Sequence, residues 1–195
     1  MLRAKLQRGF SLIELATAVT IIGLLIALGM PSLSEYVQNA RLGTAAQSFV
    51  NGLNLARSEA IRRNAPVEFM VTSNAIGPGV ENTASANGSG TNWIVRYQVG
   101  ASGPYFPVEA KSMLDGGGNA PSVTVAASDP LVTFNSLGGT TTGLINGGTA
   151  ISLKNPPMGL CAPAGPVRCW SVVVRPGGQV HLCDPAAAAG DSRAC

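Results

Sequence analysis

The sequence predicts an α+β protein in which one long N-terminal α-helix packs on a C-terminal domain of two antiparallel β-sheets. An apolar run near the N-terminus leads into a segment whose apolar residues keep a helical spacing. The remainder of the chain consists of short alternating segments separated by turns rich in Gly and Pro. With 195 residues, the chain is long enough for one domain and an anchor.

Residues 1–9 form a short basic leader, and an apolar run of 21 residues from Phe10 to Met30 follows it. At a rise of about 1.5 Å per residue, such a helix matches the hydrocarbon thickness of a bilayer. The basic residues before it should hold its front end in the cytoplasm. We therefore expect a transmembrane helix over residues 10–31, interrupted by one charge, Glu14.

Glu14 permits two interpretations, because a carboxylate near the centre of a span costs about 2.5–3.5 kcal/mol and less near its edge. It is either a tolerated interfacial charge that the helix N-terminus stabilises, or a docking group. Cleavage between Gly9 and Phe10 would create a cationic amine on Phe10. Glu14 would then lie one helical turn from that amine, or near the same amine of a neighbouring chain.

The stretch RGFSLIEL, Arg8 to Leu15, resembles the cleavage motif of type IV prepilins and type II secretion pseudopilins. The resemblance implies that a prepilin peptidase cuts after Gly9 and methylates Phe10, and that Glu14 pairs with the N-terminus of an adjoining subunit. It also implies a single-pass inner-membrane protein with a cytoplasmic leader and a periplasmic C-terminal domain, which later joins the pilus tip or fimbrium. The implied partners are other minor pilins, the major pilin and the inner-membrane assembly platform.

Residues 32–64 continue the helical pattern as an amphipathic half. Pro31 should kink the helix and Gly23 should loosen it. Pilins similarly carry a glycine and a proline here, and the helix between the two residues can melt in their filaments. The alternative is an ordinary kink without melting. Asn64, followed by Pro66, is the expected helix end. The expected apolar stripe consists of Leu33, Tyr36, Val37, Ala40, Ala45, Phe49, Leu53, Ala56, Ala60 and Ile61.

The end of this helix, LARSEAIRRN over residues 55–64, resembles the subgroup that contains FimT, FimU and GspH. We interpret Arg57, Arg62 and Arg63 as a solvated face, with a subunit contact as the alternative. Glu59 is spaced to pair with Arg62 or Arg63.

Residues 65–195 form the expected β domain, and the subgroup's known fold, a long helix on two antiparallel sheets, agrees with it. Turns are expected at 87–90, 115–119 and 176–178, the last of them closing a hairpin from Val173 to His181. The predicted strands cover 67–71, 93–99, 123–125, 131–134, 150–153, 171–174 and 179–182. Residues 185–190 are a low-complexity tail, mobile unless Cys195 ties it down.

Four cysteines follow residue 160 and allow three pairings. Near-neighbour disulfides fit best, Cys161 with Cys169 and Cys183 with Cys195, and would require an oxidising compartment. Zinc is less favoured, since no C-x-x-C pair occurs and the chain has one histidine. The alternative is a single disulfide, with the other two cysteines present as buried or free thiols.

Neither an enzyme nor a cofactor or metal site is expected, because no nucleophile–base spacing and no phosphate-binding loop occurs. The function expected is that of a minor pilin in an initiating or tip complex of a type IV pilus. One alternative is a GspH-type pseudopilin of type II secretion.

The other alternative is a FimT-type pilin, which binds DNA through a Gly-Arg-x-Arg loop. The matching loop here, Gly178 to His181, lacks both arginines and offers Gln179 and His181 beside Arg175, while Arg168 and Arg193 could substitute in part. After loss of the leader, 10 basic residues face 10 acidic ones, so strong general attraction to nucleic acid is not expected.

Overall fold

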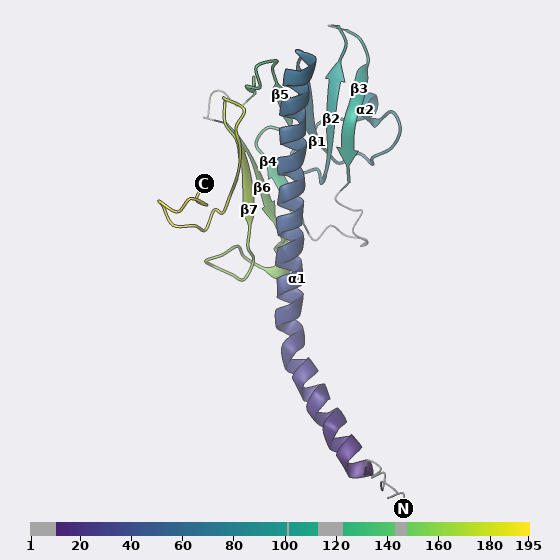
Figure 1. Cartoon of the computed structure of the whole chain (residues 1–195), viewed down its shortest axis with the longest axis vertical. Coiled ribbons are helices and arrows are strands. Elements are labelled where there is room, and N and C mark those ends of the chain that lie inside the picture. Colours follow the sequence, from purple (N-terminus) through teal and green to yellow (C-terminus); the bar gives the residue numbers. More distant parts are fainter. Residues whose placement is uncertain (1–10, 101, 113–122, 143–147) are drawn as a thin grey trace, which may run out of the picture. The chain divides into compact units, whose positions relative to one another are not determined.

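The computed structural model describes residues 11–100, 102–112, 123–142 and 148–195, and it divides the chain into two compact units, Met1–Val37 and Gln38–Cys195. The expected turn at 115–119 lies outside the described residues. Figure 1 shows the elements: α1 (Leu12–Arg63), β1 (Val67–Thr72), α2 (Val80–Thr83), β2 (Asn92–Gln98), β3 (Tyr105–Lys111), β4 (Thr124–Ala127), β5 (Leu131–Phe134), β6 (Thr149–Lys154), the 3-10 turn Pro156–Met158, β7 (Trp170–Val174) and β8 (Val180–Cys183).

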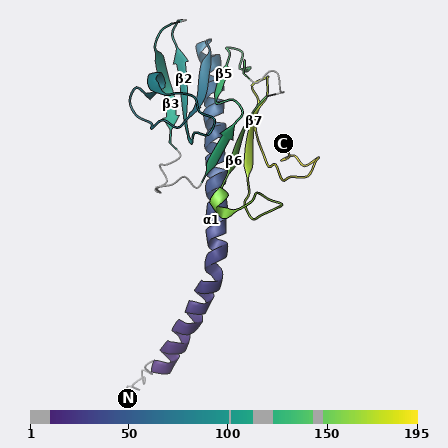
Figure 2. The ribbon, with the colours of Figure 1, turned by 180° about the vertical axis from the view of Figure 1, so that it is seen from behind.

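The strands form two four-stranded sheets, β3-β2-β1-β5 and β4-β6-β7-β8 (Figure 2). Every pairing is antiparallel. The expected α+β fold with a two-sheet antiparallel domain is therefore confirmed. The predicted hairpin is present as well, since Val174 pairs with Val180 across the turn at 176–178.

The core of the second unit lies between the C-terminal part of α1 and both sheets. From the helix it contains Phe49, Leu53, Ala56 and Ala60, which are fully buried at the predicted spacing. Their neighbours across the core come from both sheets: Phe69, Val95, Val132, Phe134, Ile151, Leu153, Val172 and Val174. Burial of these side chains is the main stabilising contribution to the fold.

Burial differs along the predicted apolar stripe. Leu33 and Tyr36 are 62% and 72% exposed, and Ile61 near the other end is 51% exposed. Leu42 and Ala46, which the stripe omitted, are fully buried. The reason is physical, since periodicity reveals an apolar face but not which part of it the β domain covers.

Gly52 lets the first sheet approach the helix closely. A Cβ at this position would lie 2.7 Å from Phe69 Cε2 and 3.1 Å from the Trp93 ring. The two rings are stacked with centroids 5.7 Å apart, and Trp93 Nε1 donates a hydrogen bond to Ser48 Oγ at 3.1 Å. The absence of a side chain at Gly52 therefore makes room for the two aromatic rings.

Strand β3 was not predicted. Its sequence, YFPVEAK, has Pro107 at its centre, which argues against an internal strand. The structure places it at an edge of the first sheet, with an irregularity opposite Val95 and Arg96. A proline is tolerated there because one side of an edge strand has no partner.

The helix ends as expected, with Asn64 in the left-handed conformation at φ 50°. The predicted pairing of Glu59 is also confirmed: it accepts hydrogen bonds from Arg62 and Arg63. The expectation of a fully solvated arginine face is wrong in part. Arg57 and Arg63 are half-buried, and the Arg63 guanidinium lies 3.7 Å from the centroid of the Tyr97 ring.

Candidate functional site

The N-terminal part of α1 carries the charged group that the sequence singled out. Gly9 and Phe10, the predicted processing residues, lie outside the described residues. Ser11 caps the helix, because Leu15 N donates to Ser11 O at 3.1 Å and Glu14 N approaches Ser11 Oγ at 3.4 Å. The exposed carboxylate of Glu14 thus belongs to the first turn, at the positive end of the helix dipole.

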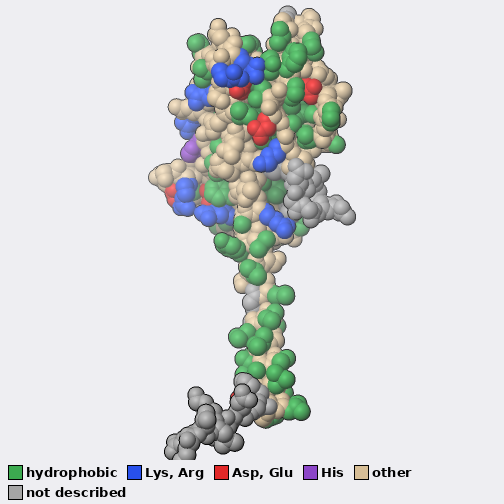
Figure 3. All heavy atoms as spheres, turned by 45° about the vertical axis from the view of Figure 1, so that its right-hand side comes forward, with side chains coloured by type: hydrophobic (Ala, Val, Ile, Leu, Met, Phe, Trp, Pro, Cys, Tyr) green, Lys and Arg blue, Asp and Glu red, His purple; other side chains and the backbone are tan. Residues whose placement is uncertain are grey.

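The side chains after Glu14 make this part of α1 apolar on all sides. Thr17 and Thr20 donate their hydroxyls to the backbone carbonyls of Glu14 and Ala16 at 3.0 and 2.7 Å, so neither needs water. Figure 3 shows this part of α1 covered largely in green. Its large apolar side chains are 51–87% exposed: Leu12, Ile13, Leu15, Val19, Ile21, Ile22, Leu24, Leu25, Ile26 and Met30. Apolar surface of this extent requires lipid or partner helices.

By length and apolarity, no single helix within the described ranges qualifies as a membrane span, whereas the segments Leu12–Ala27 and Ser32–Arg63 qualify when taken together. The helical assignment runs through both Gly23 and Pro31. The kink expected at these two residues stays a prediction.

The residues predicted for possible DNA contact meet at one pocket of about 420 Å³ beside the β7–β8 hairpin. Arg175, Gln179 and His181 line it together with Asn54 and Arg57 of α1. The turn is fixed by Gly178 N donating to Arg175 O at 2.7 Å and by Gly178 at φ 74°. Sequence reasoning missed the two helix residues, because no local pattern links them to a hairpin more than 100 positions away.

The two arginines considered as substitutes are engaged elsewhere. Arg168 Nε lies 3.7 Å from Asp184 Oδ2, and its guanidinium is 5.2 Å from the Trp170 ring centroid. Arg193 forms a 2.8 Å ion pair with Asp191 and lowers the pKa of that carboxyl to about 2, chiefly through its side-chain hydrogen bond. Neither arginine lines the pocket.

All four cysteines form disulfides, Cys161–Cys169 and Cys183–Cys195, so both bridges join near neighbours. The first bridge closes the loop before β7, and the second ties the C-terminal tail to β8. The tail is held further by Asp184 N, which donates to Arg193 O at 2.7 Å. With every sulfur in a disulfide, no thiolate is left for zinc.

Two family profiles match the chain. The family described as "Type II transport protein GspH" matches residues 45–178, and "Prokaryotic N-terminal methylation motif" matches residues 4–30. The chain belongs to the GspH family. It is thus a minor pilin or pseudopilin of the type IV pilus or type II secretion kind, and such proteins are structural subunits and not enzymes.

The individual proteins that this chain resembles share low identity with it or match only part of it. The chain is similar to the pilin-like protein PilA1 of Thermus thermophilus, with 39% identity over 71 residues, and the match spans only 44% of that relative's length and 36% of this chain. FimU of Pseudomonas aeruginosa is 12% identical with a TM-score of 0.47, covering 75% of this chain and 91% of FimU. EpsH of Vibrio cholerae is 13% identical with a TM-score of 0.49, covering 75% of this chain and 99% of EpsH.

The solution structure of Escherichia coli GspH is 14% identical with a TM-score of 0.45, covering 80% of this chain and 93% of GspH. The methylation motif indicates a pilin-type anchor, in which the N-terminal helix holds the GspH-family chain in the inner membrane.

Proposed function

We propose that this protein is a minor pilin that joins an initiating or tip complex of a type IV pilus and promotes pilus assembly. The observation that carries the proposal is Glu14, an exposed carboxylate in the first turn of an apolar helix, five residues past the expected cleavage point. In a low-dielectric environment, an unpaired carboxylate is costly, and the N-terminal amine of a neighbouring Phe10 would offset that cost. Glu14 would therefore select a partner helix and fix its axial register.

The route to that state is also part of the proposal. A prepilin peptidase cleaves after Gly9 and methylates Phe10, while the helix anchors the subunit in the inner membrane with its β domain in the periplasm. The assembly platform then combines it with other minor pilins and the major pilin. The two disulfides are consistent with an oxidising periplasm.

A GspH-type pseudopilin of type II secretion is the second candidate, and the description of the matching family favours it. The cysteine-rich C-terminus and the glycine-rich segments favour the pilus. Both machines use the same processing and the same helix chemistry. Deletion of the gene separates them, since loss of surface pili supports the first candidate and loss of secreted proteins with normal piliation supports the second.

The experiment for assembly is Glu14→Ala, with Glu35→Ala as its matched control, because both are exposed glutamates of α1. We expect Glu14→Ala to be cleaved normally but to co-purify with other pilins about tenfold less, equivalent to about 1.4 kcal/mol. Glu35→Ala should behave as wild type. Gly9→Val, in contrast, should leave the precursor uncut.

Equal co-purification of the Glu14→Ala and wild-type chains would refute the docking role of this carboxylate. Normal maturation of Gly9→Val, read as the mass of the purified chain, would refute the assigned cleavage point. The two outcomes are independent, because processing precedes assembly.

A further inference from the structure

We propose that the pocket formed by Asn54, Arg57, Arg175, Gln179, Val180 and His181, together with the exposed Leu137 close by, docks an acidic segment of a neighbouring pilin-type subunit. The proposal rests on the proposed function, since it names a surface of the β domain through which such a subunit would be held. It is independent of Glu14, which belongs to the N-terminal unit.

The two segments that line the pocket, α1 and the β7–β8 hairpin, are both in contact with the turn after β5. Arg57 Nε of α1 donates to Gly138 O at 3.0 Å, and Thr140 N donates to Pro176 O at 3.0 Å. Gly178 lies so close to the Gly138 carbonyl that a Cβ would fall 1.7 Å from its oxygen. The turn after β5 thus joins the helix to the β7–β8 turn through direct contacts, which hold the two walls of the pocket, α1 and the hairpin, together.

The charges that line this pocket have one sign. Arg57 and Arg175 are permanent cations, and Asn54, Gln179 and His181 add side chains able to donate hydrogen bonds. The pocket's described lining contains no carboxylate, and the ion pairs found in the described part of the chain do not include Arg57 or Arg175. In Figure 3, basic side chains lie beside the purple histidine.

Two arginines on facing segments suit an anionic ligand. Guanidinium groups bind carboxylates in a bidentate geometry, and the free N–H groups of Arg57 remain after its Nε has bonded Gly138. The pocket volume of about 420 Å³ accommodates a carboxylate side chain with part of its backbone.

Leu137 adds an exposed apolar side chain beside the pocket. It is 88% exposed, yet its turn is rigid, because Asn135 Oδ1 accepts hydrogen bonds from Leu137 N and Gly139 N at 3.0 Å each. The same turn lies against Ile61, which is itself 51% exposed, and a Cβ on Gly138 would be 2.8 Å from Ile61 Cδ1.

An exposed apolar side chain beside the cationic pocket offers a protein partner an apolar contact next to the charged ones, and protein interfaces combine contacts of both kinds. Duplex DNA is bound mainly through many phosphate contacts, whereas this pocket offers two permanent cations. The observations therefore favour an acidic protein segment with an apolar neighbour.

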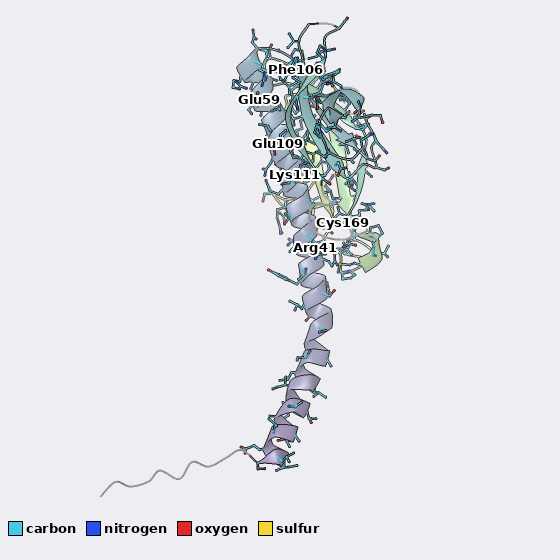
Figure 4. The ribbon with its side chains drawn as sticks, turned by 90° about the vertical axis from the view of Figure 1, so that its right-hand side faces the viewer. Arg41, Glu59, Phe106, Glu109, Lys111 and Cys169 are labelled. Atoms are coloured by element: carbon cyan, nitrogen blue, oxygen red, sulfur yellow. A yellow bond between two sulfur atoms is a disulfide. The ribbon has the colours of Figure 1, made fainter. Side chains whose placement is uncertain are left out.

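The first experiment maps the partner in cells that assemble the full-length chain. Gln179, exposed at the pocket, is replaced by the photo-crosslinking residue p-benzoylphenylalanine, and Lys111 on β3 (Figure 4) is replaced in the same way as a control position. We expect Gln179, and not Lys111, to crosslink to another pilin-type subunit within a peptide that contains Asp or Glu. Crosslinking of Gln179 to nucleic acid, or to the same peptides as Lys111, would overturn the proposal.

The second experiment tests charge and apolar contact separately. Arg175→Glu and Leu137→Ser should each lower the Gln179 crosslink about tenfold, while Lys111→Glu, an equal charge reversal on β3, should leave it unchanged. Reversing the mapped partner carboxylate to Lys should restore the crosslink of Arg175→Glu. Equal effects of Arg175→Glu and Lys111→Glu, at unchanged thermal unfolding midpoints, would refute the site.

The proposed function and the docking site fail in different ways. A wild-type chain that co-purifies with no pilin-type subunit refutes both. A wild-type chain that co-purifies with pilins, and does so equally well with Arg175→Glu and Leu137→Ser, refutes the docking site alone.

Discussion

Two glycines of α1 provide a sharp test of how closely the helix packs on the first sheet. Ala is more favourable than Gly in a helix interior by about 0.8–1.0 kcal/mol, so Gly→Ala should stabilise wherever there is room. At Gly43 there is room, since a Cβ would meet only Trp170 Nε1, at 3.9 Å. At Gly52 there is not, since a Cβ would lie 2.7 Å from Phe69 Cε2 and 3.1 Å from two Trp93 ring atoms.

The cost at Gly52 follows from how its neighbours are held. Phe69 and Trp93 are 0% and 2% exposed, stack on each other, and the indole is tied to Ser48. Overpacking such a site costs about 1–3 kcal/mol, and the helix propensity returns about 1 kcal/mol. We expect Gly52→Ala to destabilise the protein by about 1 kcal/mol and Gly43→Ala to stabilise it by a similar amount.

The measurement is thermal unfolding of the full-length chain in detergent micelles, followed by tryptophan fluorescence. Both tryptophans, Trp93 and Trp170, belong to the second unit, so the signal reports on the β domain. One kcal/mol corresponds to about 2–4 °C for a domain of this size, which puts the two variants about 4–8 °C apart. A Gly52→Ala variant as stable as Gly43→Ala would refute the close approach described here.

Two further predictions concern the C-terminal tail and the end of the helix. The double variant Cys183→Ser, Cys195→Ser should lose about 3 kcal/mol of stability and gain protease cleavage in its tail, as read by unfolding midpoints and peptide mapping. Hydrogen bonding from Arg62 lowers the pKa of Glu59 from its ordinary value of 4.5. The ionised Glu59 therefore contributes to the stability of the folded chain above pH 4.5, and this contribution is lost as the pH falls through the lowered pKa. The difference in melting temperature between wild type and Glu59→Gln should therefore shrink below about pH 4.5, while a constant difference from pH 7 to pH 3 would contradict the pairing.

Local patterns account for what the sequence could predict. Alternating residues in β5 and β6, the Pro-Gly-Gly turn and the positive φ at Asn64 depend on neighbours within a few positions. The N-terminal motif is equally local, because the expected cleavage point and Glu14 lie within six consecutive residues, 9–14. Near-neighbour disulfides also follow from short spacings in the sequence.

The features that sequence reasoning missed depend on distant contacts. Arg57 meets Gly138 across 81 positions, so its helical spacing indicates only a polar face. Strand β3 was not predicted because it contains Pro107, and a proline argues against a strand unless the strand is known to lie at an edge. Leu33 and Tyr36 belong to the predicted apolar stripe and are nevertheless exposed, since an apolar stripe does not reveal which of its residues stay exposed.

Each of the two proposed contacts joins groups of opposite charge, and this pairing limits the assemblies that the chain can form. Glu14 is a carboxylate that would receive an amine from another subunit, whereas the pocket of Arg57 and Arg175 would receive a carboxylate. In the pocket contact the two interacting surfaces differ, so that contact is not self-complementary, whereas Glu14 and the Phe10 amine lie on the same short segment of the helix. Contacts of this heterologous kind generate rings when the rotation between subunits closes and open helical filaments when it does not. A heterologous contact at the pocket fits an open assembly, and a closed two-fold dimer of this chain that covers the pocket with the same pocket of its partner would contradict that assignment.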